Sequence, residues 1–77
     1  MKQIVIVTER TDGIQCVYVD GVLRLADDQI YAGELVEFCD SNGVIITAMY
    51  ADLPENWSFE WPDQLSELIR IQEELSR

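Results

Sequence analysis

Apolar residues flank the dipeptide Asp20-Gly21 on both sides and predict a β-hairpin. Residues 16–19 and 22–25 are apolar or β-branched at nearly every position. A type I′ turn needs positive φ at both central residues, which Gly adopts freely and Asp tolerates, so this dipeptide favours a two-residue loop. The pairs that such a loop sets across the hairpin are Val19 with Val22, Tyr18 with Leu23, Val17 with Arg24, and Cys16 with Leu25.

Side-chain alternation divides this hairpin into two faces. The face expected to point into the core carries Cys16, Tyr18, Leu23 and Leu25. The opposite face carries Val17, Val19, Val22 and Arg24. Because three of these four residues are valines, we expect the second face to need a partial cover as well.

Two further apolar runs predict strands on either side of the hairpin in the sequence. Residues 4–7 form a continuous β-branched run, which is typical of an interior strand buried on both faces, and we expect this strand within residues 1–9. The polar residues 10–13 end in Gly and predict a turn, so the chain returns antiparallel over residues 14–19. Residues 44–50 are apolar at nearly every position and predict a fourth strand.

Apolar residues at helical spacing predict two helices. The first covers residues 30–39, begins after Asp27 or Asp28 as an N-terminal cap, and ends at residues 40–43. The second begins at Pro62 and Asp63, since Pro suits the first helical turn. The inward stripes are Ala32, Leu35, Val36 and Cys39 in the first helix, and Leu65, Leu68, Ile69, Gln72 and Leu75 in the second.

The order of these elements predicts an α+β fold in a single domain over residues 1–77. A strand, a helix and a strand in succession indicate a crossover, which is right-handed in nearly all proteins. The fourth strand then runs parallel to the third and lies beside the first. We therefore expect the order βββαβα and a four-stranded mixed sheet, in the spatial order 4-1-2-3, with one or two helices packed on it.

The chain is strongly acidic, and its acids are concentrated in the middle. Fifteen acidic residues oppose five basic ones, for a net charge of −10, and no Lys or Arg lies between Arg24 and Arg70. Such a field repels nucleic acid and anionic membranes and favours encounter with a basic protein surface. The ten acids of this span are Asp27, Asp28, Glu34, Glu37, Asp40, Asp52, Glu55, Glu60, Asp63 and Glu67.

Motifs for catalysis, cofactors and metals are missing from the sequence. It has no His, no nucleotide-binding glycine loop and no nucleophile elbow. The two cysteines, Cys16 and Cys39, lack metal-ligand spacing and fall on inward faces of the predicted elements, where free Cys behaves as a small apolar residue. We expect no enzyme activity, no cofactor and no metal. The longest apolar run, residues 4–7, is too short to span a membrane and lacks the length and the cleavage site of a signal peptide, so we expect a cytoplasmic protein.

Three aromatic residues at alternate positions form the best candidate for an apolar binding feature. Trp57, Phe59 and Trp61 project to one side if the chain is extended there. One interpretation is a lid over the valine-rich face of the hairpin. The other is an exposed interface bordered by acids, which would serve a protein partner or a homodimer.

The layout of the chain resembles that of short orphan proteins encoded in phage and bacterial genomes. The resemblance rests on Tyr18-Val19-Asp20-Gly21 before an apolar strand, on the acidic start of the following helix, and on Leu53-Pro54-Glu55 after the last strand. It implies a source in which some proteins inhibit host defence systems, as anti-CRISPR proteins do, by blocking a basic nucleic-acid site. A phage-encoded protein would act in the host cytoplasm. These motifs are turns and caps, so they carry over no functional residue.

These observations predict a non-catalytic interaction protein that binds a basic, nucleic-acid-binding surface of a protein partner. Its carboxylates would imitate the phosphates of DNA, as in a phage-type inhibitor of a nucleic-acid-processing or defence complex. Two alternatives stay open: the acids serve only solubility, or the protein is a structural module that forms a homodimer or subunit contact through its sheet face and aromatic residues. The predicted contact residues are Asp27, Asp28, Glu34, Glu37, Asp40, Glu55, Trp57, Phe59, Glu60, Trp61 and Asp63.

Overall fold

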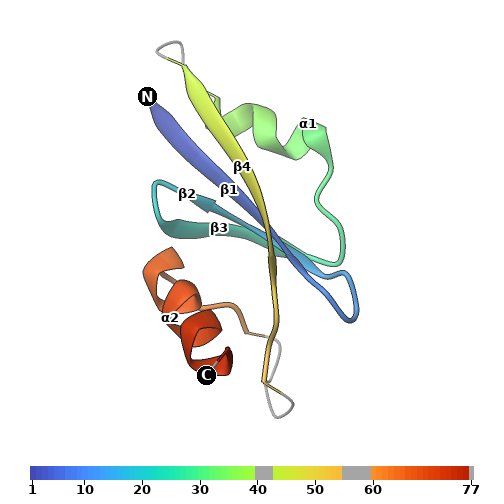
Figure 1. Ribbon diagram of the computed structural model, residues 1–77. Helices are drawn as coiled ribbons and strands as arrows, with labels where there is room; N and C mark the ends of the chain where they lie inside the picture. Colours follow the sequence, from blue (N-terminus) through green and yellow to red (C-terminus); the bar gives the residue numbers. More distant parts are fainter. Residues whose placement is uncertain (40–42, 55–59, 77) are drawn as a thin grey trace.

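A four-stranded mixed sheet with two helices forms the protein, as the sequence predicts (Figure 1). The computed structural model describes residues 1–39, 43–54 and 60–76. The spatial order is β3-β2-β1-β4, which is the predicted order; β1 is antiparallel to β2 and parallel to β4, and β2 is antiparallel to β3. The elements are β1 Lys2–Glu9, β2 Gln15–Val19, β3 Val22–Asp27, α1 Ala32–Leu35 with the 3₁₀ turn η1 Val36–Phe38, β4 Val44–Ala51, and α2 Leu65–Leu75.

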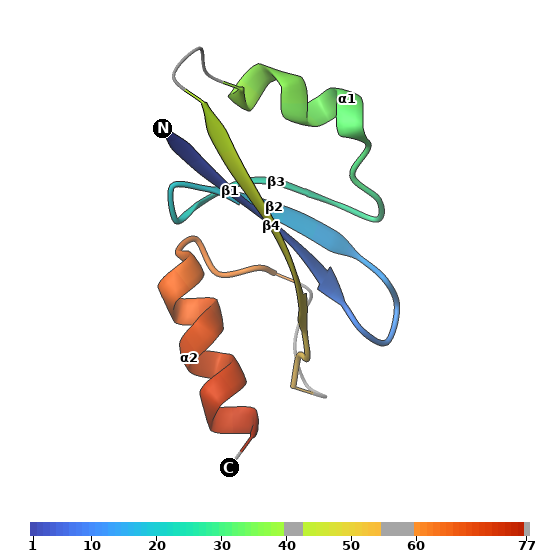
Figure 2. The same ribbon diagram turned by 45° about the horizontal axis from the view of Figure 1, so that its top comes forward.

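The two helices cover opposite faces of the sheet, so the core has two layers (Figure 2). On the face of α1 and η1, here called the valine face, Ile4, Val17, Val19 and Phe38 form a buried cluster. On the face of α2, here called the tyrosine face, the buried cluster is Val7, Cys16, Tyr18, Ala51, Trp61 and Leu68. The central strands are therefore buried on both sides, as the continuous β-branched run in β1 predicts.

The predicted turn at Asp20-Gly21 is present and is tied to β1. Asp20 has φ 50° and Gly21 φ 85°, the positive values that a type I′ turn requires. The Asp20 carboxylate accepts the N–H of Gln3 at 2.9 Å, and the Asp20 N–H donates to the Gln3 carbonyl at 2.8 Å. The acid at the turn thus fixes the hairpin against the neighbouring strand.

The predicted pairing of the hairpin is wrong beyond Leu23, because Arg24 is an extra residue in β3. Val17 lies opposite Leu25 instead of Arg24, and the register shifts between Val17 and Tyr18. This shift moves Leu25 to the valine face, where it packs against the buried cluster. Arg24 is exposed, and its guanidinium carbon lies 5.7 Å from the centre of the Phe38 ring. A bulge here packs the partly buried Leu25 against the core and leaves a cation outside, which explains why strict alternation fails.

The first helix is shorter than predicted and faces a different way. It begins at Ala32 without a side-chain cap, so neither Asp27 nor Asp28 caps it. Phe38 is buried and Leu35 packs on the valine face, whereas Val36 is 68 % exposed. Cys39, expected to be buried, is also exposed. The bulky Phe38 lies within the short 3₁₀ turn η1 and takes the inward position that the regular helical stripe assigned to Val36 and Cys39.

The second helix begins at Leu65 because the residues before it pair with the hairpin. The Leu23 N–H donates to the Asp63 carbonyl, and the Leu65 N–H donates to the Gly21 carbonyl, each at 2.9 Å. The inward residues of α2 are Leu68 and Ile71, with Leu65 packed beside them. Of the predicted stripe, Ile69 and Leu75 are 43 % and 45 % exposed.

A buried carboxylate organises the turn between β1 and β2. Glu9 is 5 % exposed, and its two oxygens accept the N–H groups of Thr11 and Asp12, both at 2.7 Å. These backbone donors, that of Asp12 first, lower the pKa of Glu9 below its ordinary value of 4.5. A group with a lowered pKa stabilises the fold above its ordinary pKa, and this contribution is lost as the pH falls through the lowered value.

We expect Glu9→Gln to destabilise the fold by about 2 kcal/mol at pH 7, because an amide offers one acceptor oxygen where two N–H groups need acceptors. Urea unfolding followed by circular dichroism measures this difference. The difference in the free energy of unfolding between Glu9→Gln and the wild type should become smaller as the pH falls below 4.5. Asp12→Asn removes a charge from the same turn without removing these acceptors and serves as the control. Equal losses in the two variants would contradict the role of the Glu9 carboxylate.

We also expect the two cysteines to differ in reactivity. Burial raises the pKa of Cys16 to about 12, and its side chain has no exposed surface, whereas Cys39 is exposed. A maleimide should therefore label the native chain only at Cys39, and both residues in urea, as mass spectrometry of tryptic peptides would show. Native Cys39→Ser should remain unlabelled. Protection of Cys39 from labelling in the native chain would contradict its exposure and would support the longer helix that the sequence predicts.

Candidate functional site

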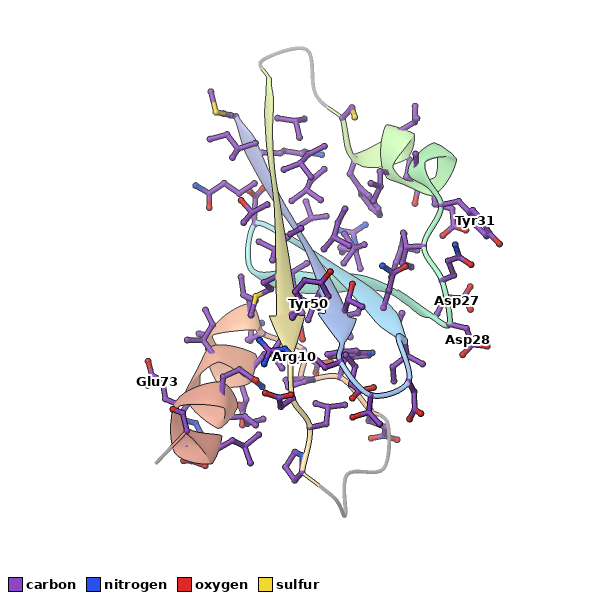
Figure 3. The ribbon with its side chains drawn as sticks, turned by 45° about the vertical axis from the view of Figure 1, so that its right-hand side comes forward. Arg10, Asp27, Asp28, Tyr31, Tyr50 and Glu73 are labelled. Carbon is purple, nitrogen blue, oxygen red and sulfur yellow. The ribbon has the colours of Figure 1, made fainter. Side chains whose placement is uncertain are left out.

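An acidic hollow lies at the end of β3, where the chain leaves the sheet. It has a volume of about 380 Å³ and is lined by Ile14, Ala26, Asp27, Asp28 and Trp61. We call these five residues the acidic hollow. Figure 3 shows Asp27 and Asp28 side by side next to the chain that leads to α1. The hollow therefore combines an apolar wall with two adjacent acidic residues.

Backbone and side-chain hydrogen bonds position the two acids. Asp27 is the last residue of β3, opposite Gln15 of β2, and its carboxylate accepts the N–H of Asp28 at 2.7 Å. The Gln15 amide oxygen accepts the N–H of Ile30 at 2.8 Å, and its NH₂ group donates to the Thr8 hydroxyl at 3.1 Å. Gln15 thus ties the chain after Asp28 to the sheet. No sequence signal distinguishes Gln15 from other polar residues at strand ends.

Ion pairs in the described part of the chain lie away from this hollow. Arg10 pairs with Asp52 at 3.3 Å, and Arg70 pairs with Glu67 at 2.9 Å and with Glu74 at 2.7 Å. Arg24, the base nearest in sequence, lies over Phe38 on the valine face. Within the described residues, no Lys or Arg forms an ion pair with Asp27 or Asp28, so the negative charge of the hollow is not neutralised there.

The structure brings together three of the predicted contact residues, Asp27, Asp28 and Trp61. Glu60 precedes Trp61 and is exposed; Glu34 is half-buried and Glu37 exposed in the segment of α1 and η1. Asp63 lies elsewhere, because its carbonyl bonds to Leu23 at the other end of β3. The remaining predicted contact residues, Asp40, Glu55, Trp57 and Phe59, lie outside the described residues.

Trp61 is a core residue that also forms a wall of the hollow. It is 8 % exposed and packs with Cys16 and Tyr18 on the tyrosine face. The predicted lid over the valine-rich face is therefore wrong for Trp61, and Phe38 covers that face instead. The lid prediction reversed the two faces because it took no account of how the second helix returns.

Potential nucleophiles beside the hollow are neutral and serve packing. Burial raises the pKa of Cys16 to about 12 and, as the main cause, also raises that of Tyr18. The Tyr18 hydroxyl donates to the Pro62 carbonyl at 2.7 Å, which holds the chain after Trp61 against the sheet. The site thus offers charge and shape, with no activated nucleophile among its described residues.

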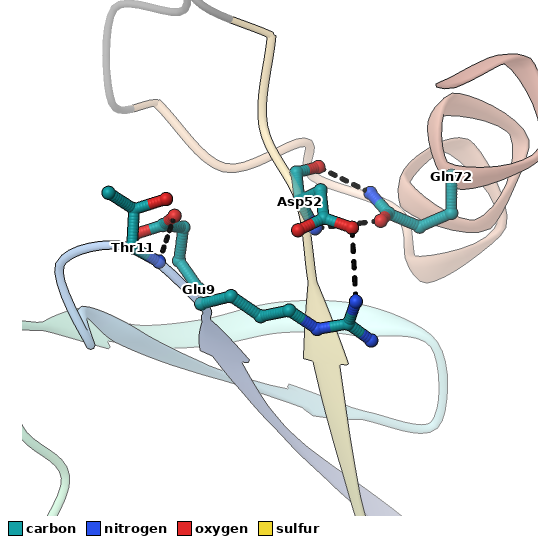
Figure 4. Close-up of polar contacts among 5 residues, drawn as sticks. Glu9, Thr11, Asp52 and Gln72 are labelled. Atoms are coloured by element: carbon teal, nitrogen blue, oxygen red, sulfur yellow. Dashed lines mark hydrogen bonds and ion pairs between the residues drawn. The ribbon is translucent and has the colours of Figure 1, made fainter. Parts of the chain in front are cut away.

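A second polar cluster joins the end of β4 to α2. The Gln72 amide accepts the N–H of Asp52 and donates to its carbonyl, both at 2.8 Å, and Asp52 also pairs with Arg10 (Figure 4). A hollow of about 410 Å³ beside it includes Tyr50 and Glu73. The hydrogen bonds between Gln72 and Asp52 hold α2 to the end of β4. Because Arg10 already matches the Asp52 charge, this cluster is a weaker candidate for a cationic ligand than the acidic hollow.

Comparison with protein families, with curated proteins and with solved structures finds no match for this chain. The helices described here are too short and too polar to cross a membrane. Over residues 1–39, 43–54 and 60–76, no three Cys, Asp or Glu residues gather in a group that could hold a metal ion.

Proposed function

We propose that the protein is a non-catalytic binding protein whose acidic hollow holds a Lys or Arg side chain from a basic surface of a protein partner. One observation carries this proposal: Asp27, Asp28 and Trp61 line one hollow, and no base in the described residues pairs with its carboxylates. Adjacent carboxylates repel each other, and a bound cation relieves that repulsion. A guanidinium suits the site best, because it bonds to carboxylates with two parallel N–H groups and also stacks against aromatic rings.

Another exposed acid adjoins the hollow in the sequence, because Glu60 directly precedes Trp61. Glu34 and Glu37 belong to the segment of α1 and η1, on the other face of the sheet from Trp61, and add to the negative charge of the molecule as a whole. Like-signed charges over a surface speed the encounter with an oppositely charged partner and add specificity. Surfaces that bind nucleic acid are rich in Arg and Lys, so they fit this description best. The resemblance to short phage and bacterial proteins supports a finer proposal, an inhibitor that occupies such a surface in a nucleic-acid-processing or defence complex.

An arginine octapeptide with a fluorescent label provides a defined probe of this hollow. We expect Asp27→Asn combined with Asp28→Asn to weaken its binding about tenfold in fluorescence anisotropy, because two charge-assisted contacts are lost. Raising the salt from about 50 mM to about 300 mM should also weaken binding to the wild type, since exposed charges are screened.

The matched control removes an adjacent pair of acids from α2, by Glu73→Gln with Glu74→Gln. Both residues are exposed, and Arg70 keeps its pairing with Glu67. We expect this control to weaken binding no more than about twofold, because it removes two negative charges, as the Asp27 and Asp28 variant does, without changing the hollow. Equal losses in the two double variants would show that total charge governs binding, and the hollow would then have no special role.

A further inference from the structure

The two edges of the sheet are treated differently by the rest of the chain. Along β3, the Leu23 N–H bonds to the Asp63 carbonyl, and Gln64 forms a bridge with Val22, so the chain before α2 covers part of that edge. Along β4, in contrast, the described residues form no backbone hydrogen bond on the side away from β1. The outer edge of β4 is thus the open edge of the sheet in the part of the chain that the structure describes.

Alternate residues of β4 direct their backbone groups to this open edge. The Lys2 N–H donates to the Gly43 carbonyl, and the Arg10 N–H donates to the Ala51 carbonyl, at the two ends of the parallel ladder with β1. Since ladder bonds recur every second residue, the odd-numbered residues of β4 bond to β1. The N–H and C=O groups that point outward belong to Val44, Ile46, Ala48 and Tyr50.

The side chains of β4 do nothing to discourage another strand. Its sequence, Val-Ile-Ile-Thr-Ala-Met-Tyr-Ala, has no charge, Pro or Gly, although the chain has a net charge of −10. Natural edge strands usually carry such residues to prevent pairing. Instead, Ile46 is 55 % exposed, Tyr50 64 % and Ile45 48 %. An open, apolar edge of this length is typical of a strand that pairs with another chain.

We propose that β4 pairs with β4 of a second copy of this chain, antiparallel and across a two-fold axis at Ala48, to form a continuous eight-stranded sheet. The pattern Ile46-Ala48-Tyr50 is large, small and large about Ala48, and all three side chains lie on one face. Centring the axis on Ala48 places each Ile46 across from Tyr50 of the second copy. Such β-branched and aromatic pairs stabilise adjacent strands.

The ends of β4 also suit an antiparallel arrangement. Lys2 lies beside Val44 at the start of β4, and the ion pair of Arg10 with Asp52 lies at its end. Antiparallel pairing sets Lys2 of each copy near this ion pair of the other, whereas parallel pairing would set the two positively charged Lys2 residues together. A β4 strand from a second copy has the same length and also lacks charge. The outward N–H and C=O groups of each strand can therefore bond to the C=O and N–H groups of the other.

The dimer responds to salt in the opposite way from the proposed binding of a basic partner. Each copy has a net charge of −10, so two copies repel each other at low ionic strength. Salt screens this repulsion and should strengthen the dimer, because the interface itself is apolar. Salt should release a basic partner. The two proposals therefore fail independently.

Sedimentation velocity on the full chain, over a range of protein and salt concentrations, tests the dimer. We expect a species of twice the chain mass that becomes more populated as salt rises. Ile46→Lys should weaken dimerisation at least about tenfold, although it makes each copy less negative and so reduces repulsion. Ala48→Pro should also weaken dimerisation, because it removes an N–H that points to the outer edge. The fold should be kept, because the bonds between β4 and β1 do not use this N–H.

The matched control is Val22→Lys, which puts the same charge on β3, where Val22 is 43 % exposed. This variant should dimerise like the wild type, and circular dichroism should show that all variants are folded. Monomers at every concentration would overturn the proposal and leave the open edge to a strand of another protein. A dimer that survives Ile46→Lys but not Val22→Lys would also overturn it, because the interface would then lie at the other edge.

Discussion

The structure depends on one constraint: the central strands β1 and β2 are apolar on both faces and need cover on both. Ile4 and Val7 of β1 are fully buried on opposite faces, as are Val17 and Tyr18 of β2. The chain meets this requirement with two short covers, the segment of α1 and η1 on one face and α2 with Trp61 on the other. The acidic hollow, at the end of β3, and the open edge of β4 both lie at the margins of the sheet.

Some of the acidic residues make hydrogen bonds or ion pairs that join separate parts of the fold. Glu9 and Asp20 accept backbone N–H groups at two turns, while Asp52 pairs with Arg10 and also accepts from Gln72 through its carbonyl. Part of the charge that looks functional in the sequence is thus structural. What distinguishes Asp27 and Asp28 is their place beside an apolar wall, with no paired base in the described residues. Counting charges alone would not separate these two groups.

Local signals predicted the sheet well, and failures arose where tertiary packing decided between local options. The local sequence specifies the Asp20-Gly21 turn and the buried strand β1, and the strand order could be predicted from these two elements. The bulge at Arg24 and the inward turn of Phe38 did not, because each depends on which face needs an apolar residue. The hollow itself joins acids at the end of β3 to Trp61, which is distant in the sequence. Only the return of the chain along the outer edge of β3, held by Asp63, brings them together.

The two surface features are compatible because they lie at opposite edges of the sheet. The acidic hollow is at the end of β3, and the open edge is β4, with β2 and β1 between them. At a spacing of about 4.8 Å between strands, β3 and β4 are roughly 14 Å apart. A dimer through β4 would therefore leave both hollows accessible near the outer edges of the joined sheet. Two hollows related by a two-fold axis would engage a basic partner with two cationic sites more tightly than one hollow does, provided that the sites match their separation. In that arrangement, the apolar edge sets the spacing and the carboxylates supply the attraction.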